Sequence, residues 1–175
     1  METTPPEDEA IELFWAEARK VTGLTRLDVI VGTSDTASLT PPAWSFGDTA
    51  EMADELADLV LAGRKTATAS ALWEWEAEDE DLPRPGDLAI VCDGAGRPRA
   101  LVRTDDVQVV PFDAVGAEHA RAEGEGEATL ESWRREHRDH FTAAVAPRPF
   151  ATDMPVVLER FTVLHPRVRR ASPAT

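Results

Sequence analysis

The chain has 175 residues, of which 42% are hydrophobic and 29% are charged. This length and composition predict one packed globular domain with an added segment, and they exclude an intrinsically disordered chain. The formal net charge of −15 argues against general polyanion binding, because lysine and arginine side chains are what hold a nucleic-acid backbone.

The start of the chain has neither the basic end nor the apolar stretch of a signal peptide, and no apolar run is long enough to span a bilayer. A single cysteine, Cys92, cannot form an internal disulfide or a cysteine-based zinc site, which is typical of a reducing compartment. We therefore expect a cytoplasmic protein without a membrane segment. Cys92 is expected to be a small buried apolar residue.

Charge is distributed unevenly along the chain. Residues 1–90 contain 20 acids and 6 bases, whereas residues 91–175 contain 13 acids and 12 bases. Any surface that faces an anion is therefore expected in the second half. Nine of its twelve arginines fall into three groups, each more often a solvated face than a binding surface: Arg97, Arg99 and Arg103; Arg134, Arg135 and Arg138; Arg167, Arg169 and Arg170.

The first predicted element is a helix over residues 8–20. Ile11, Trp15 and Ala18 share one helical stripe there. Residues 21–44 contain few periodic apolar positions and are therefore predicted to be a connecting segment.

A second helix is predicted over residues 49–62. Asp48 and Glu51 form a capping pattern at its start, and Gly63 stands where a left-handed residue ends a helix. Its apolar stripe is expected in the core, together with residues from later elements: Met52, Leu56, Leu59, Val60, Trp133, Phe141, Val157 and Phe161.

Threonine-rich residues 64–72 follow and are typical of the start of a strand. Residues 73–87 are acidic and close with proline and glycine, which favours a solvated loop. Trp73 and Trp75 lie in this loop. Ordinary partial burial is the favoured interpretation for both, with a base-stacking surface as the alternative.

The second half predicts more strands than helices. Alternating apolar residues predict strands over 88–92, 100–103 and 107–110, joined as an antiparallel meander. Residues 112–141 are mostly helical, and residues 155–164 alternate as a further strand. Short turns between strands and interrupting helices predict an α+β domain with a small, mostly antiparallel sheet that curls or closes.

The last predicted helix carries one face of large side chains. Thr129 is a suitable N-cap, and Trp133, His137 and Phe141 follow one another at offsets of four residues. On this face His137 is more often a satisfied core histidine than a ligand. The four histidines predict no metal site, and we expect no cofactor.

Lys65 stands out because the chain contains only two lysines against sixteen arginines. A desolvated lysine can lose its proton and act as a base or nucleophile, which a guanidinium cannot do. The simpler alternative is a surface lysine at a helix end. Glu159 shares a strand face with Val157 and Phe161, so it needs a partner if it points inward, and Lys65 is a suitable one.

Five segments resemble the ASCH domain, a relative of the PUA-like domains associated with RNA. In the family order they are WSFGD, LVLAGRKTATAS, PRPGDLAIV, HARAEGEGEATLESWRREH and VVLERFTVL. The resemblance covers residues 44–165 and implies a small PUA-like β-barrel with flanking helices. Residues 1–43 are then a helix and connection packed on this domain, and residues 166–175 are a flexible tail.

The resemblance also implies a pocket beside the G-x-K-T loop. In amidohydrolase members of the family the functional residues are a lysine, a threonine three positions later and a later glutamate. These match Lys65, Thr68 and Glu123, the last through an H-A-x-x-E pattern. Residues expected to contact the substrate around them are Trp44, Phe46, Arg64, Thr66, Ser70, Trp133, His137 and Glu159.

We therefore expect a hydrolase of an acylated nucleoside amide such as N4-acetylcytidine, because a neutral substrate meets no repulsion from the acidic chain. The first alternative is an RNA-binding protein or a ribonuclease acting on single-stranded RNA. The second is a non-catalytic module for a modified nucleotide. In the hydrolase, Lys65→Ala and Glu123→Gln are expected to lower turnover and to leave the melting temperature nearly unchanged.

Overall fold

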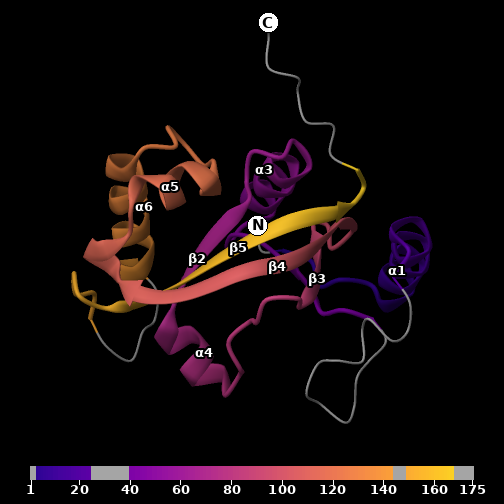
Figure 1. Ribbon diagram of the computed structural model, residues 1–175, viewed down its shortest axis with the longest axis horizontal. Helices are drawn as coiled ribbons and strands as arrows, with labels where there is room; N and C mark the ends of the chain where they lie inside the picture. Colours follow the sequence, from indigo (N-terminus) through magenta and orange to yellow (C-terminus); the bar gives the residue numbers. More distant parts are fainter. Residues whose placement is uncertain (1–2, 25–39, 144–148, 168–175) are drawn as a thin grey trace, which may run out of the picture. The chain divides into compact units, whose positions relative to one another are not determined.

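Figure 1 shows the computed structural model of the chain, which describes residues 3–24, 40–143 and 149–167. The helices are α1 (Asp8–Thr22), α3 (Ala50–Leu61), α4 (Leu72–Glu78), α5 (Ala117–Glu123) and α6 (Leu130–Ala143), with a 3-10 turn η1 (Phe112–Ala114). The strands are β1 (Ala43–Ser45), β2 (Ala67–Ala71), β3 (Leu88–Cys92), β4 (Pro98–Pro111) and β5 (Pro155–His165). None of the helices in these ranges is long and apolar enough to cross a bilayer.

The strands form one mixed sheet in the order β1-β3-β4-β5-β2. β1 runs parallel to β3, while the pairs β3–β4 and β2–β5 are antiparallel. This arrangement confirms the predicted α+β class with a mostly antiparallel sheet.

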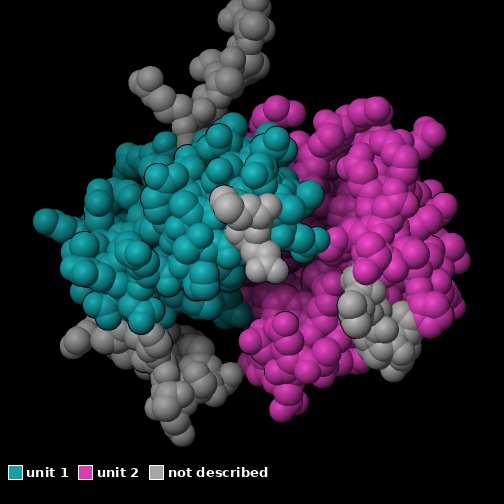
Figure 2. Space-filling view, turned by 180° about the vertical axis from the view of Figure 1, so that it is seen from behind, with its two compact units in different colours: residues 1–63, 86–103, 162–175 teal, residues 64–85, 104–161 magenta. Residues whose placement is uncertain are grey.

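The chain is divided into two compact units, shown in teal and magenta in Figure 2. The first consists of residues 1–63, 86–103 and 162–175, and the second of residues 64–85 and 104–161. Strands β4 and β5 each pass from one unit into the other, since the division falls within both of them.

The first unit has a core in which α1 packs on the sheet. Ile11, Trp15 and Ala18 of α1 contact Ile90, Cys92 and Leu101, which lie on β3 and β4. α1 ends at Gly23, whose φ of 75° is left-handed, and the burial of Ile11, Trp15 and Ala18 confirms the predicted helical stripe. Cys92 is fully buried as expected. Burial, assisted by the Asp93 charge, raises the pKa of its thiol to about 11.

The second unit has an aromatic core. Phe112 of η1 packs 5.2 Å from Trp133 of α6, and Phe141 meets the edge of Trp73 at 6.2 Å between ring centroids. Offset and edge-to-face contacts of this kind add to the stabilisation from burial itself. Met154 and Val156 complete this core from the start of β5.

Helix α3 departs from the sequence prediction at its N-terminus and in one core residue. The cap is Thr49, whose hydroxyl accepts a hydrogen bond from the Met52 N–H at 3.2 Å, because Asp48 lies one residue too early. Met52 is 45% exposed, and its side chain packs against Gly47. The prediction that Met52 lies in the core is therefore wrong. Leu59 is half-buried. The remaining predicted core residues are buried: Leu56, Val60, Trp133, Phe141, Val157 and Phe161.

Two predicted elements were wrong further along the chain. The acidic segment predicted as a loop begins with the helix α4, in which the Glu74 carboxylate accepts a hydrogen bond from the Ala71 N–H at 3.0 Å. The two strands predicted over 100–103 and 107–110 are one continuous strand, β4. The polar residues between them stay in the sheet because Thr104 is buried and donates a hydrogen bond to Glu159 at 2.5 Å. The predicted connection and C-terminal tail lie largely outside the described residues.

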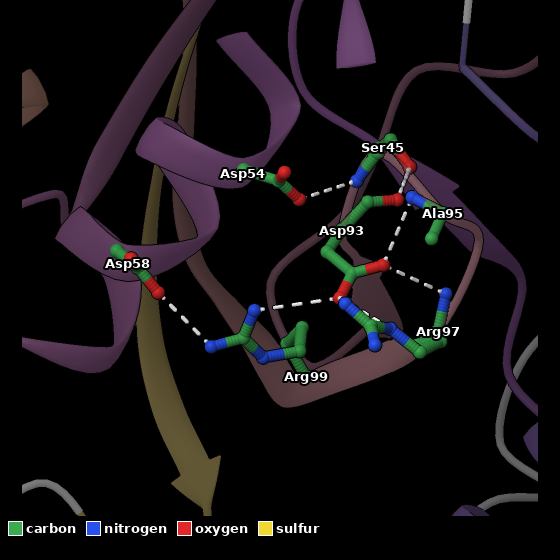
Figure 3. Close-up of polar contacts among 8 residues, drawn as sticks. Ser45, Asp54, Asp58, Asp93, Ala95, Arg97 and Arg99 are labelled. Carbon is green, nitrogen blue, oxygen red and sulfur yellow. Dashed lines mark hydrogen bonds and ion pairs between the residues drawn. The ribbon is translucent and has the colours of Figure 1, made fainter. Parts of the chain in front are cut away.

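A buried carboxylate organises the turn between β3 and β4 (Figure 3). Asp93 accepts hydrogen bonds from the backbone N–H groups of Ala95 and Arg97, each at 3.0 Å, and from the Arg97 side chain at 2.9 Å. Burial on its own raises the pKa of Asp93, but these bonds and the Arg97 charge outweigh it and hold the pKa below its ordinary value.

Two acids of helix α3 bind this turn and the start of β4. Asp54 accepts a hydrogen bond from the Gly94 N–H at 2.9 Å, and Asp58 pairs with Arg99 at 2.9 Å (Figure 3). Gly94 lies so close to the helix that a Cβ there would stand 2.2 Å from the Ala50 carbonyl oxygen. The turn and the first turn of α3 therefore form one closely packed structure in the first unit.

Candidate functional site

The buried lysine lies in the short segment between α3 and β2. The Lys65 side chain is only 1% exposed. The residue after it is tied to the end of α5, because both the N–H and the hydroxyl of Thr66 donate hydrogen bonds to the Ala122 carbonyl oxygen, at 2.7 and 3.2 Å. The surface-lysine alternative is therefore wrong for this position.

A glycine allows α5 to end directly against this segment. Gly124 has a left-handed φ of 68°, and a Cβ at this residue would lie 2.4 Å from the Arg64 carbonyl oxygen. The close approach sets Glu123, the last residue of α5, opposite Lys65. Their Nζ and Oε2 atoms are 4.0 Å apart.

Glu123 is a buried carboxylate surrounded by donors. Its Oε1 accepts hydrogen bonds from the Trp133 indole N–H at 2.7 Å and from His119 Nε2 at 3.0 Å. Its Oε2 lies 3.4 Å from His137 Nε2. Helices α5 and α6, which lie side by side in Figure 1, supply all of these groups.

This environment keeps Glu123 ionised. Burial alone raises the pKa of a carboxyl group, but the hydrogen bonds from His119 and His137 and the charges of His137 and Lys65 outweigh it and lower the pKa of Glu123 far below its ordinary range. An anion this stable is a poor proton acceptor. It is suited instead to holding a cation or to orienting an N–H donor.

His137 links the carboxylate to the aromatic core. Its ring stacks on Trp133 with centroids 4.1 Å apart, and its Nδ1 lies 3.0 Å from the Trp133 carbonyl oxygen. Both ring nitrogens thus lie beside oxygen atoms that can accept a hydrogen bond. The predicted core histidine is therefore also a partner of the site carboxylate.

A second carboxylate contacts the lysine from the solvent side. Glu125 Oε1 accepts a short hydrogen bond from Lys65 Nζ, and its side chain is 30% exposed, against 2% for Glu123. Lys65 therefore has one buried and one half-buried carboxylate beside it.

Thr68 lies on β2, where it pairs in register with Glu159 of β5. It is half-buried, and its hydroxyl has no hydrogen-bond partner among the described residues. The structure thus brings Lys65 and Glu123 together, and among the described residues no hydrogen bond joins Thr68 to either of them. Glu159 accepts the hydrogen bond from Thr104, so this part of the strand face is polar.

The other predicted contact residues have varied surroundings. Ser70 accepts a hydrogen bond from the Trp75 indole at 2.8 Å, and Arg64 is exposed. Trp44 and Phe46 belong to the first unit, where they meet edge to face at 4.5 Å between centroids.

The sequence prediction missed His119 and Glu125 as members of the site. His119 carried a usable signal, since it stands four residues before Glu123 and an offset of four places both on one helix face. Glu125 carried none, because its contact depends on the left-handed turn at Gly124.

The described part of the chain contains no group of three or more histidine, cysteine, aspartate or glutamate side chains that could hold a metal ion. A groove of about 530 Å³ lies along α6, and none of the residues that line it contacts Lys65 or Glu123 in the hydrogen bonds and ion pairs described above. It is lined by Leu130, Glu131, Arg134, Arg135, Arg138 and Asp139.

Comparison with known proteins agrees with this fold. The family model for the ASCH domain matches residues 42–165. A crystal structure of a protein from Enterococcus faecalis V583, described by the family model DUF984, is 35% identical, with a TM-score of 0.75 over 89% of this chain and 88% of that one. The ASCH domain structure from Lactobacillus crispatus JV V101 is 27% identical, with a TM-score of 0.77 over 94% of this chain and 99% of that one. None of the curated proteins matches the chain.

The fold is thus the α+β, PUA-like fold of an ASCH domain. The chain belongs to the ASCH domain family, which is generally associated with RNA binding.

Proposed function

We propose that the protein hydrolyses the amide of an acylated nucleoside such as N4-acetylcytidine. The observation that carries this proposal is the buried Lys65–Glu123 pair, in which a cation and an anion lie 4.0 Å apart within a network of hydrogen bonds. Charges are costly to bury, so a pair held inside a small domain is a candidate for chemistry. The residues match those that the resemblance to amidohydrolases implies.

Each residue has a proposed role that its surroundings support. Two carboxylates lie beside the Lys65 ammonium, a cation suited to stabilising negative charge on an amide oxygen. The low pKa of Glu123 favours orientation of the substrate amine over proton transfer. Thr68 has a hydroxyl without a hydrogen-bond partner among the described residues, which suits an attacking group.

In the proposed reaction the Thr68 oxygen forms a bond to the acyl carbon as the carbon–nitrogen bond breaks. Lys65 gives a proton to the leaving nitrogen and recovers one from the Thr68 hydroxyl. The nucleoside amine departs, and water then hydrolyses the acyl-threonine to release the free acid and regenerate the hydroxyl.

The surroundings of the pair change which variants test this proposal best. Lys65 and Glu123 are both buried, and removing either takes one partner from a buried charge, although Glu125 and the two histidines remain beside the site. We therefore expect Lys65→Ala and Glu123→Gln to lower the free energy of unfolding by about 1–3 kcal/mol, and with it the melting temperature that the sequence predicted to be nearly unchanged.

Thr68 offers the cleaner test. Thr68→Val keeps the shape of the side chain and removes the hydroxyl, so we expect turnover of N4-acetylcytidine to fall by at least about 100-fold with a nearly unchanged melting temperature. Thr68→Ser restores a hydroxyl and should retain measurable turnover. The measurement is release of cytidine under saturating substrate. Wild-type turnover by Thr68→Val would refute the attacking role.

A second candidate function is RNA binding, which the groove along α6 favours. Arg134, Arg135 and Arg138 line that groove, and arginine side chains are suited to phosphate. The nearby Glu131 and Asp139 reduce the positive charge of the surface. The salt dependence of binding separates the two functions, because phosphate contacts release counterions and a neutral nucleoside releases none.

A further inference from the structure

The Lys65 ammonium is covered in this structure by a residue of its own chain. Glu123 lies behind it as the buried partner, whereas Glu125 contacts it from the side that reaches solvent. With Glu125 in place the Lys65 side chain is 1% exposed.

We propose that Glu125 is a displaceable cover that occupies the ligand position on the Lys65 ammonium. Its carboxylate oxygen sits where an acceptor oxygen of a ligand has to bind if that ligand is to contact Lys65. A ligand therefore enters by taking over the hydrogen bond that Glu125 now makes. The inference rests on the proposed function only in taking that acceptor to be the carbonyl oxygen of an acylated nucleoside.

The backbone around Glu125 is suited to such a movement. Gly124, Gly126 and Ala128 have positive φ values of 68°, 48° and 52°, so every second residue from 124 to 128 turns away from helical geometry. α5 ends before Glu125 and α6 begins at Leu130, so neither helix has to unwind for the carboxylate to swing outward.

The charges indicate what kind of ligand fits. When Glu125 leaves, Glu123 still lies 4.0 Å from the Lys65 ammonium and remains its partner. A ligand with a neutral acceptor oxygen adds no charge beside this carboxylate. A phosphate group adds negative charge beside Glu123 and beside the displaced Glu125, and both carboxylates repel it. The cover therefore selects for an uncharged acceptor.

Amine labelling tests the cover directly, because the chain has only two lysines and the other, Lys20, is exposed on α1. The native protein is acetylated with the N-hydroxysuccinimide ester of acetic acid, and peptide mass spectrometry gives the labelling rate of Lys65 relative to Lys20. In Glu125→Ala we expect this ratio to rise by about tenfold or more, since one charge-assisted hydrogen bond is lost and the amine is uncovered. Glu125→Gln should give a smaller rise.

The matched control is Glu127→Gln, which removes one charge from an exposed residue of the same loop and should label like the wild type. An unchanged Lys20 rate shows that the variants remain folded. The proposal is overturned if Lys65 labels as fast as Lys20 in the wild type, or if Glu125→Ala labels like Glu127→Gln.

Binding of N4-acetylcytidine gives a second readout, measured by calorimetry in a Thr68→Val background to prevent turnover. Removal of the competitor should tighten the Kd several-fold in Glu125→Gln relative to Glu127→Gln. Weaker binding would show that Glu125 holds the ligand, and this would refute displacement. If the nucleoside binds to no variant, the proposed function is refuted. A rise of Lys65 labelling in Glu125→Ala would in that case still support Glu125 as the cover of the ammonium.

Discussion

Glu123 shows how one residue can be kept charged inside a protein core. A carboxylate in an apolar environment ordinarily takes up a proton, since burial penalises the anion. Here the Trp133 indole N–H and the two histidines donate to it, and the Lys65 ammonium lies 4.0 Å away. The site is thus a cluster of opposite charges, and its contribution to the free energy of unfolding depends on pH.

The pH dependence follows from the lowered pKa of Glu123. The folded protein holds this carboxyl below its ordinary pKa of 4.5, so the unfolded chain binds a proton more readily. The stabilisation is therefore fully present above pH of about 4.5 and is lost as the pH falls below that value. We expect the free energy of unfolding in urea to decrease more steeply below this pH in the wild type than in Glu123→Gln. An equal decrease of the free energy of unfolding with falling pH in the two proteins would contradict a lowered pKa of Glu123 in the folded state.

At the residue scale the sequence predicted the members of the site better than their contacts. Lys65 and Glu123 were identified through a motif, and the structure places them together. Their dependence on Gly124 was not predictable, because it arises from the absence of a side chain next to the Arg64 carbonyl oxygen. Glu125 was missed for the same reason, since its direction is set by backbone angles that residue types alone do not specify.

At the scale of elements, the turn between β3 and β4 holds α3 through side chains instead of through an apolar contact alone. Asp93 binds groups within the turn, Asp54 contacts the turn from the helix, and Asp58 contacts Arg99 at the start of β4. This arrangement predicts unequal effects for similar substitutions, because Asp93 is buried and Asp58 is 69% exposed.

Asp93→Asn is expected to lower the free energy of unfolding by about 1–3 kcal/mol, because its amide turns a donor toward Arg97 or Arg99 in place of an acceptor. Asp58→Asn removes the same charge from an exposed ion pair and should cost less than about 1 kcal/mol. Chemical denaturation of both variants at neutral pH provides the comparison. Equal losses would show that the burial of Asp93 does not determine its contribution.

Element prediction failed where tertiary contacts override local composition. The acidic segment after β2 has few apolar residues, yet α4 forms because Trp73 enters the core and Glu74 caps the first turn. β4 continues through a polar stretch because Thr104 finds a partner on β5. Strongly periodic segments such as α1 and β5 were predicted within two residues of their ends.

At the scale of the whole molecule, the net charge of −15 limits which partners can bind through charge. The more basic half contains the arginines of the α6 groove, but acids line the same groove. The division into two compact units was not predictable, because strands β4 and β5 belong to both of them.

Salt dependence distinguishes the ligands at this scale. We expect the affinity for N4-acetylcytidine, measured in the Thr68→Val background, to change less than about twofold between 50 and 200 mM salt, since a neutral ligand releases no counterions. A single-stranded RNA decamer bound through the α6 groove would lose affinity steeply over this range, and Arg135→Gln would reduce that slope. A steep loss for the nucleoside would argue against a neutral-ligand site.

The contact between Gly124 and the Arg64 carbonyl oxygen restricts how this protein can diverge or be redesigned. Any larger residue at position 124 pushes apart the two segments that carry Lys65 and Glu123, whatever side chains those segments bear. The specificity of the site can be altered by substituting its functional groups one at a time. The backbone that carries the site can be transferred to another protein only if the segment before β2 and the end of α5 are transferred together.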